Sequence, residues 1–152
     1  MIIIRTLVAA LAAALLLVAG SAQAQDARYG EQKVVYHINF DGGETAGPYM
    51  SALGNVRNHI NAVGRENITV RVVLHGDGVH LLRDAKDNTD LQQRVLDMRA
   101  QGVRFLVCRN TLTGRNIDYE WDLFEVFEED IVPSGVAELS HLQQQGYTYV
   151  RP

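Results

Sequence analysis

The chain has 152 residues, and its 14 basic and 18 acidic side chains give a formal net charge of −4. An acidic chain of this kind is a poor ligand for nucleic acid or for an anionic membrane surface, which leaves a protein or a small molecule as the partner. Its length suits one domain with a single core, and its one cysteine, Cys108, has no second cysteine to pair with.

The first residues predict a signal peptide. Arg5 precedes an apolar run at 7–19, and the small-x-small pattern AQA ends at Ala24. The 13-residue run is shorter than the roughly 18 residues that a membrane-spanning helix needs. We therefore expect residues 1–24 to be removed on export and residues 25–152 to form a single periplasmic domain that does not bind the membrane. An uncleaved membrane anchor is the alternative.

Three short apolar runs predict β-strands. They lie at 34–40, 68–74 and 103–107, and they are rich in β-branched and aromatic residues. Their almost continuous apolar character indicates strands that are covered on both faces, as in a parallel sheet.

Two helices are predicted between these strands. The first begins at Pro48 and ends before Gly64, and its apolar residues recur at three- and four-residue steps. The second begins at a Thr89-x-x-Gln92 capping box and ends before Gly102.

The last third of the chain adds a helix and a strand. Apolar residues at 136–142 share one helical face after Pro133, and the residues from Tyr147 onward alternate like a strand. Alternating strands and helices predict right-handed β-α-β crossovers in an α/β layer fold. We expect a mainly parallel central sheet of about five strands, with the C-terminal strand in the same sheet.

A polar segment follows each of the first three predicted strands. These segments read HINFDGG from His37, LHGDGV from Leu74 and VCRNT from Val107. Ligands of open parallel sheets bind beyond the carboxyl ends of the strands, so we expect the functional site there. The candidate residues are His37, His75, Gly76, Asp77, Cys108, Arg109, Asn110 and Thr111.

Cys108 stands at the end of its strand, and two interpretations of it are open. Arg109 beside it, and the N-terminal amides of a helix starting near Thr111, would favour the thiolate and lower the pKa of the thiol. Such a thiolate is a nucleophile. In the other interpretation Cys108 is the buried end of a strand, because free cysteine is among the most buried residue types.

The segment after the second strand carries the next candidates. Its two glycines permit a positive φ or a close approach of the backbone to a ligand. His75 or Asp77 would then carry a proton or orient a bound group, and the alternative is a tight turn capped by Asp77. His37 lies inside a strand and is predicted to be a core histidine with its hydrogen bonds satisfied. Copper or zinc held by Cys108 with His37 or His75 is a further interpretation, but no closely spaced ligand pair supports it, and we predict no metal site.

Residues 118–130 form an acidic segment that also contains aromatic residues. The sequence DYEWDLFEVFEED holds seven acidic side chains and no basic one. It predicts an amphipathic helix with a solvated acidic face. Contact with a subunit or another partner is the alternative, because aromatic residues are enriched at the cores of interfaces.

Several segments, taken in order, resemble one known family. A strand ending in HGDGV, a helix, and then QGVRFLVC with its cysteine closing the next strand are similar to the DsrE/DsrF-like sulfur-relay proteins. The resemblance extends from Lys33 to Pro152, and the ending VPSGVAELSHLQQQGYTYVRP is similar to one branch of the family.

The resemblance implies a three-layer α/β sandwich that assembles into homotrimers or hexamers and uses no cofactor. In the relay members, the cysteine matched by Cys108 accepts a sulfur atom as a persulfide and passes it on. Only Cys108 carries over as the sulfur carrier, whereas the HGDGV segment matches as a structural neighbour. The relay members act in the cytoplasm, and an exported protein departs from them in that respect.

The chemistry of sulfur transfer agrees with a single cysteine. Attack on a persulfide or polysulfide requires a thiolate, and a second cysteine nearby would resolve the product into a disulfide. We therefore expect a periplasmic sulfur carrier that exchanges sulfur with donor and acceptor proteins or small sulfur compounds. Cys108 would be the acceptor, with Arg109, Asn110 and His75 as helpers. The alternative is a non-enzymatic, oligomeric binding or assembly module in which Cys108 is a buried structural residue.

Overall fold

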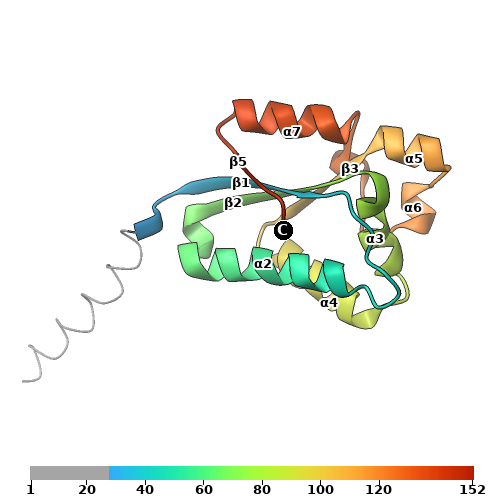
Figure 1. Cartoon of the computed structure of the whole chain (residues 1–152), viewed down its shortest axis with the longest axis horizontal. Helices are drawn as coiled ribbons and strands as arrows, with labels where there is room; N and C mark the ends of the chain where they lie inside the picture. Colours follow the sequence, from blue (N-terminus) through green and yellow to red (C-terminus); the bar gives the residue numbers. More distant parts are fainter. Residues whose placement is uncertain (1–27) are drawn as a thin grey trace, which may run out of the picture.

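Five parallel strands form one sheet in the order β4-β3-β2-β1-β5. The computed structural model describes residues 28–152, so the predicted signal peptide lies outside the described residues. The strands are β1 (Gln32–Ile38), β2 (Ile68–Leu74), β3 (Arg104–Cys108), β4 (Ile131–Val132) and β5 (Thr148–Val150). Helices cover both faces of this sheet (Figure 1), which confirms the predicted three-layer α/β fold with a parallel sheet.

Two long helices, α2 (Gly47–Val63) and α4 (Thr89–Ala100), cover one face of the sheet (Figure 1). Their apolar residues recur every three or four positions, so each helix presents one continuous apolar stripe to the sheet. The buried residues of these stripes are Tyr49, Ala52, Leu53, Val56, Ile60, Val63, Leu91, Val95 and Met98. They pack against alternate strand residues such as Val34, Val72 and Phe105 in the larger of the two core clusters.

A single helix, α7 (Gly135–Gln144), covers the opposite face (Figure 1). The Ser134 side chain caps its first turn by accepting a hydrogen bond from the Ala137 amide. Beneath the helix lies a second, smaller core cluster, formed by Val35, Val73, Leu106, Val132, Leu139 and Leu142. Because strand side chains alternate between faces, this cluster fixes which strand residues face α7.

Short elements gather at the carboxyl ends of the strands, on the right of Figure 1. They are the α-helices α3 (His80–Asp84), α5 (Arg109–Arg115) and α6 (Tyr119–Asp122) and the 3₁₀ turn η2 (Gly76–Val79), whereas the 3₁₀ turn η3 (Glu128–Asp130) lies alongside β3, where Asp130 binds Arg104. A further 3₁₀ turn, η1 (Arg65–Asn67), precedes β2 at the other end of the sheet. Within residues 28–152, no helix combines the length and the apolar composition that crossing a membrane requires.

Three local predictions differ from the structure. The N-cap of α4 is Asn88, whose side chain accepts a hydrogen bond from the Leu91 amide, and Thr89 is already helical. Helix α5 begins at Arg109, two residues before the predicted start near Thr111. The acidic segment is not one amphipathic helix, because α6 ends at Asp122 and Glu125 adopts a left-handed backbone with φ of 52°.

Candidate functional site

Three predicted site residues lie on the same face of the sheet, at the carboxyl ends of neighbouring strands. On each strand the residue two positions earlier packs beneath α7, namely Leu106 on β3, Val73 on β2 and Val35 on β1. Side chains two positions apart point to the same face, so Cys108, His75 and His37 also face the α7 layer. The β2–β3 pairing ends at Leu74 and Val107, so His75 and Cys108 are the next residues along these neighbouring strands.

Cys108 is the last residue of β3 and the N-cap of α5, and its side chain is 5% exposed. Burial raises the pKa of this thiol because it disfavours the thiolate. Hydrogen bonds to the sulfur, from the Gly135 amide, the Thr111 hydroxyl and the Thr111 and Asn110 amides, act in the opposite direction and outweigh it. The pKa of Cys108 is therefore below the ordinary value for cysteine, even though the side chain is buried.

The Thr111 hydroxyl is oriented by the segment that follows β2. The Gly76 amide donates a hydrogen bond to Thr111 Oγ1 over 3.0 Å. Because this bond occupies a lone pair of the hydroxyl oxygen, the hydroxyl hydrogen is free to point at the Cys108 sulfur. Gly76 has φ of 55°, which confirms the positive φ that the sequence suggested for this turn.

Gly135, the first residue of α7, brings the helix against the site. A Cβ atom at this position would lie 2.9 Å from His75 Cβ and 3.2 Å from Cys108 Cβ. Only glycine allows this approach, which brings the Gly135 amide to the sulfur. His75 and Cys108 therefore contact the same point of the helix.

His37 and His75 form a hydrogen-bonded pair. Their Nε2 atoms lie 2.6 Å apart, and their rings stack with centroids 4.7 Å apart. The other ring nitrogen of His37, Nδ1, lies 2.7 Å from the Tyr149 hydroxyl of β5. Burial, the neighbouring His75 and Arg151 lower the pKa of His37 to about 4, and burial lowers the pKa of His75. Both imidazoles are therefore neutral at neutral pH.

Two predicted site residues have partners elsewhere. Arg109 Nη2 binds Glu128 Oε1 at 2.9 Å, and the groups that lower the pKa of Cys108 do not include this guanidinium. The Asp77 carboxylate binds Arg115 at 2.7 Å, so Asp77 stabilises the loop beside the site. Asn110 acts on the sulfur through its backbone amide.

The sequence did not single out Gly135 and Tyr149 as site residues. Tyr149 belongs to a predicted strand, but only the pairing of β5 with β1 places it next to His37. Gly135 is one of 13 glycines, and nothing in its neighbourhood distinguishes it before α7 is packed on the sheet. The alternation of Tyr147 and Tyr149 was the one available signal, since it implies that both tyrosines point to one face.

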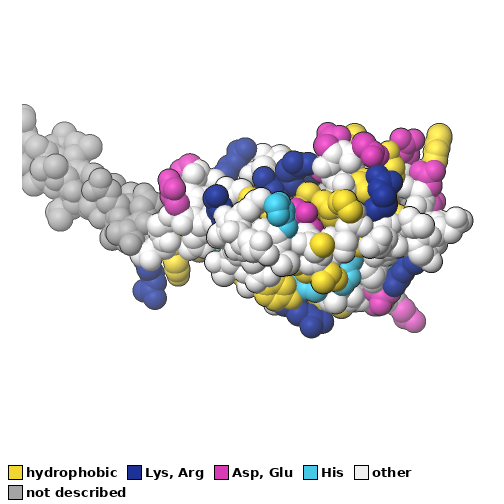
Figure 2. Space-filling model, turned by 90° about the horizontal axis from the view of Figure 1, so that it is seen from above, with side chains coloured by type: hydrophobic (Ala, Val, Ile, Leu, Met, Phe, Trp, Pro, Cys, Tyr) yellow, Lys and Arg dark blue, Asp and Glu magenta, His cyan; other side chains and the backbone are white. Residues whose placement is uncertain are grey.

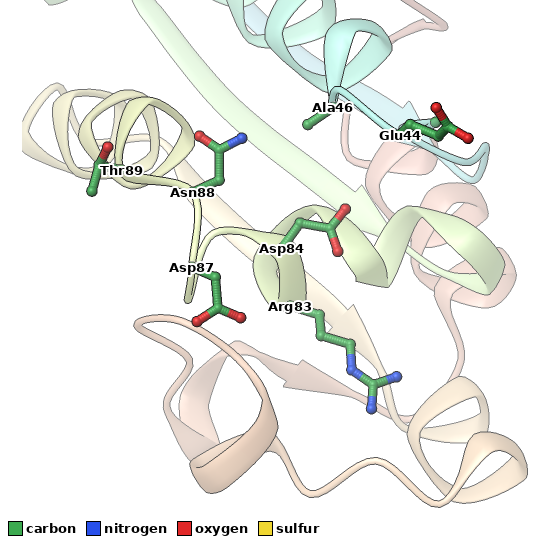
Figure 3. Close-up of a pocket in the computed structure, with 8 residues that line it drawn as sticks. Glu44, Ala46, Arg83, Asp84, Asp87, Asn88 and Thr89 are labelled. Carbon is green, nitrogen blue, oxygen red and sulfur yellow. The ribbon is translucent and has the colours of Figure 1, made fainter.

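A hollow of about 650 Å³ lies away from these residues, between the start of α2, α3 and the turn into α4 (Figure 3). Its lining is polar and includes Arg83, Asp84 and Asp87, without a cysteine or a histidine. Burial is the main cause that raises the pKa of Asp84. Among residues 28–152, no group of three or more histidine, cysteine, aspartate or glutamate side chains is arranged to hold a metal ion. The strand ends around Cys108 therefore remain the better candidate site.

Acidic and hydrophobic side chains gather at the upper right of the molecule in the view of Figure 2. The acidic segment at 118–130 supplies two exposed aromatic side chains, with Trp121 75% exposed and Phe127 49% exposed. Its Glu128 carboxylate binds both Arg109 and the Tyr119 hydroxyl. The acidic segment is therefore joined to α5, the helix that begins directly after Cys108.

Comparisons with known proteins agree with this architecture. The solved structure of MTH1491 from Methanobacterium thermoautotrophicum, described as a protein of unknown function, is 32% identical, with a TM-score of 0.65 over 80% of this chain and 100% of that chain. The YchN protein of E. coli is 18% identical, with a TM-score of 0.61 over 80% of this chain and 99% of that chain, and it shows the fold alone. No protein with a curated description matches the sequence. The family model of the DsrE/DsrF-like family matches residues 32–152, and the chain belongs to that family.

Proposed function

We propose that this protein is an exported sulfur carrier that accepts sulfane sulfur as a persulfide on Cys108. The observation that carries the proposal is the buried Cys108 thiol, whose pKa is lowered by hydrogen bonds from Thr111, Asn110 and Gly135. A thiolate is the form of cysteine that attacks sulfur. The DsrE/DsrF-like family, with its sulfur-relay members, supports the same chemistry.

The proposed acceptance step is a transfer of one sulfur atom. The Cys108 thiolate attacks the terminal sulfur of a donor persulfide, R–S–SH, and a new S–S bond forms while the donor S–S bond breaks. The electron pair of the broken bond leaves with R–S⁻, which then takes up a proton. The net change is Cys108–SH plus R–S–SH giving Cys108–S–SH plus R–SH. Release repeats the step with an acceptor thiol as the nucleophile.

The surroundings of Cys108 suit a persulfide that must last until it meets an acceptor. The chain contains no second cysteine that could resolve the persulfide into an intramolecular disulfide. The 5% exposure of Cys108 limits access by oxidants. The amides and the hydroxyl that stabilise a thiolate would also stabilise a persulfide anion, because both are sulfur anions at the same edge of the sheet.

The proposal includes the setting in which the carrier works. We expect the signal peptide predicted at 1–24 to direct it to the periplasm, where it would exchange sulfur with donor and acceptor proteins or small sulfur compounds. A homotrimer or hexamer is the proposed assembly. Fractionation of cells, with light scattering of the purified mature protein, tests both statements.

Intact-mass spectrometry before and after treatment with polysulfide tests the proposed function. The wild-type protein should gain the mass of one sulfur atom, and a thiol reductant should reverse the gain. The Cys108→Ser variant should gain nothing, and because it has no thiol it is a complete control. A gain of sulfur by Cys108→Ser, or no gain by the wild type, would refute the carrier function.

A binding or assembly module is the second candidate function. The exposed Trp121 and Phe127 in the acidic segment favour it, because aromatic residues that a soluble protein leaves exposed often contact a partner. In that case Cys108 should be unreactive toward an alkylating reagent in the folded protein and reactive after unfolding. Reactivity of Cys108 in the folded protein would exclude a purely structural cysteine.

A further inference from the structure

Tyr149, His37 and His75 form a continuous hydrogen-bonded row across three strands. The row runs from the Tyr149 hydroxyl to His37 Nδ1 at 2.7 Å, and from His37 Nε2 to His75 Nε2 at 2.6 Å. Its outer end is accessible to water, since Tyr149 is 40% exposed. Its inner end is His75, which follows β2 as Cys108 ends β3, and a Cβ atom at Gly135 would meet the Cβ atoms of both residues. The row therefore links solvent to the strand end that carries the thiol.

Two proton arrangements satisfy every bond of this row. In the first, His75 Nε2–H donates to His37 Nε2, and His37 Nδ1–H donates to the Tyr149 oxygen, which leaves His75 Nδ1 with a lone pair. In the second, every bond is reversed, so Tyr149 donates to His37, His37 donates to His75, and His75 Nδ1 carries a hydrogen. Changing from the first to the second takes in a proton at His75 and releases one at Tyr149, while both imidazoles stay neutral.

We propose that Tyr149, His37 and His75 form a proton-transfer chain in which His75 takes the proton of the Cys108 thiol and returns a proton to the departing sulfur. The proposal rests on the proposed function in one respect, that Cys108 acts as a nucleophile toward sulfur. His75 is the acid and base of the chain. His37 and Tyr149 are positioning residues that act through His75 by setting its tautomer and exchanging protons with water.

The proton accounting follows the two arrangements. The Cys108 thiol gives its proton to His75 Nδ1, and the shift along the row releases a proton from Tyr149 to water. The thiolate then attacks a sulfur–sulfur bond, and the electron pair of the broken bond leaves with R–S⁻. His75 Nδ1–H protonates R–S⁻, and the row returns to its first arrangement by taking a proton from water at Tyr149. No oxidant or reductant takes part.

The charged and titratable groups of the elements around the row are Arg151 after β5, Lys33 on β1, Arg71 on β2, Arg104 and Cys108 on β3, and Glu138 and His141 on α7, the helix packed over this face. After burial, His75 and Arg151 are the groups that lower the pKa of His37, because each disfavours a positive charge on its ring. A neutral row at neutral pH agrees with proton transfer by a change of tautomer.

Thiol–disulfide exchange with two probes tests the proton-transfer chain. An aromatic disulfide releases a thiolate of low pKa that needs no proton, whereas an alkyl disulfide releases a basic thiolate that does. With the alkyl probe, His75→Gln should slow the reaction of Cys108 by about 100-fold, the lower end of the usual contribution of an acid or base, and Tyr149→Phe should cause a smaller loss. With the aromatic probe, both variants should lose less, because only the step that takes the proton of the Cys108 thiol is impaired and the leaving thiolate needs no proton.

The matched control is Tyr147→Phe, which removes a hydroxyl from a tyrosine two positions away on the same strand face. It should react like the wild type with both probes. Nitrogen NMR of the imidazoles adds a second readout, in which Tyr149→Phe should change the tautomers of both His37 and His75 and Tyr147→Phe should change neither.

Equal losses with the two probes, or no loss with the alkyl probe, would overturn the proton-transfer chain. An effect of Tyr149→Phe on the His37 tautomer that does not reach His75 would also overturn it. Neither probe carries sulfane sulfur, so these results are independent of the sulfur-carrier function. If the two probes give the results expected of the proton-transfer chain and polysulfide adds no mass to the protein, only the carrier function is refuted. If polysulfide adds sulfur to the protein and the variants lose rate equally with the two probes, only the proton-transfer chain is refuted.

Discussion

At the scale of single residues, the hydrogen bonds to Cys108 decide whether it is a core residue or a nucleophile. Burial alone would make the thiolate unfavourable. Hydrogen bonding from the Gly135, Thr111 and Asn110 amides and from the Thr111 hydroxyl favours the thiolate, and its combined effect on the pKa of Cys108 outweighs that of burial. Three of the four donors are backbone amides, which every residue except proline has, so they leave no trace in the sequence.

The Thr111 hydroxyl is the one side-chain donor to this sulfur, and it can be removed by substitution. Thr111→Val should raise the pKa of Cys108 and slow its alkylation at neutral pH by about tenfold, because the thiolate loses one charge-assisted hydrogen bond. Alkylation followed across the pH range measures both effects. Thr113→Val is the control, since Thr113 lies exposed on the same helix and does not act on the sulfur. Equal changes in the two variants would contradict the assigned role of Thr111.

The lowered pKa of His37 makes the stability of the fold depend on pH. In the unfolded chain His37 has its ordinary pKa of 6.5, and in the fold its pKa is about 4. As pH falls from 6.5 toward 4, the unfolded state binds a proton that the folded state does not, so the free energy of unfolding falls, and below about 4 the effect levels off. Allowing for partial exposure, the loss should be about 1–2 kcal/mol.

Urea unfolding at a series of pH values checks this expectation. His37→Gln should make the dependence between pH 6.5 and 4 shallower, because one of the rings whose pKa the fold lowers is gone. His141→Gln, at an exposed position on α7, should keep the wild-type dependence. A wild-type protein that becomes more stable as the solution is acidified through this range would show the opposite sign and refute the assignment.

At the scale of elements, the start of α7 completes the site. The helix brings the Gly135 amide to the Cys108 sulfur, and it can do so only because residue 135 has no side chain. Ser134 fixes the first turn, and Leu139 and Leu142 anchor the helix on the sheet. The thiol environment therefore depends on the packing of the whole helix, and it should weaken when the helix is displaced.

Gly135→Ala should displace this helix. Its Cβ would lie 2.9 Å from His75 Cβ and 3.2 Å from Cys108 Cβ, so the fold should lose about 1–3 kcal/mol and Cys108 should react more slowly at neutral pH. Gly54→Ala is the matched control, because a Cβ there meets nothing within 4 Å in the middle of α2. It should gain about 1 kcal/mol through helix propensity and leave Cys108 unchanged. Unchanged stability and thiol reactivity in Gly135→Ala would contradict the close approach.

Asp130 connects the acidic segment to the layer beneath it. Its carboxylate is 2% exposed and binds Arg99 of α4 at 2.9 Å and Arg104 of β3 at 3.6 Å. Asp130→Ala would leave these guanidinium groups without a carboxylate to neutralise them and should cost about 3 kcal/mol in urea unfolding. Glu129→Ala, beside it, should stay within about 0.5 kcal/mol of the wild type. Similar stability in both variants would show that this ion pair does not hold the segment in place.

At the scale of the whole molecule, the sequence predicted the elements whose apolar pattern is long and regular. The strand at 68–74 and the helices α2, α4 and α7 were located to within a few residues, because burial against a sheet imposes a clear period. The two-residue strand β4 was not predicted, and the prediction of one amphipathic helix for the acidic segment was wrong. Both are stabilised by tertiary contacts such as those of Asp130, which no local pattern records.

The sequence likewise predicted some parts of the candidate site and not others. A parallel sheet places the carboxyl ends of its strands at one edge, so the sequence alone could bring His75 and Cys108 together as neighbours. Strand order and register are needed to place Tyr149 beside His37, and helix packing is needed to place Gly135 on the sulfur. Arg109 shows that a neighbour in sequence need not be a partner in the fold, because its guanidinium binds Glu128 instead of acting on the Cys108 thiol.

The central physical claim is that the fold lowers the pKa of a buried thiol. The most direct test is a titration of the thiolate absorbance of the one cysteine, in the folded protein and in the protein unfolded by urea, with Cys108→Ser as the blank. A pKa of Cys108 that is lower in the folded than in the unfolded protein is the predicted result. A higher pKa in the folded protein would mean that burial outweighs the hydrogen bonds, and it would leave Cys108 as a structural residue of the core.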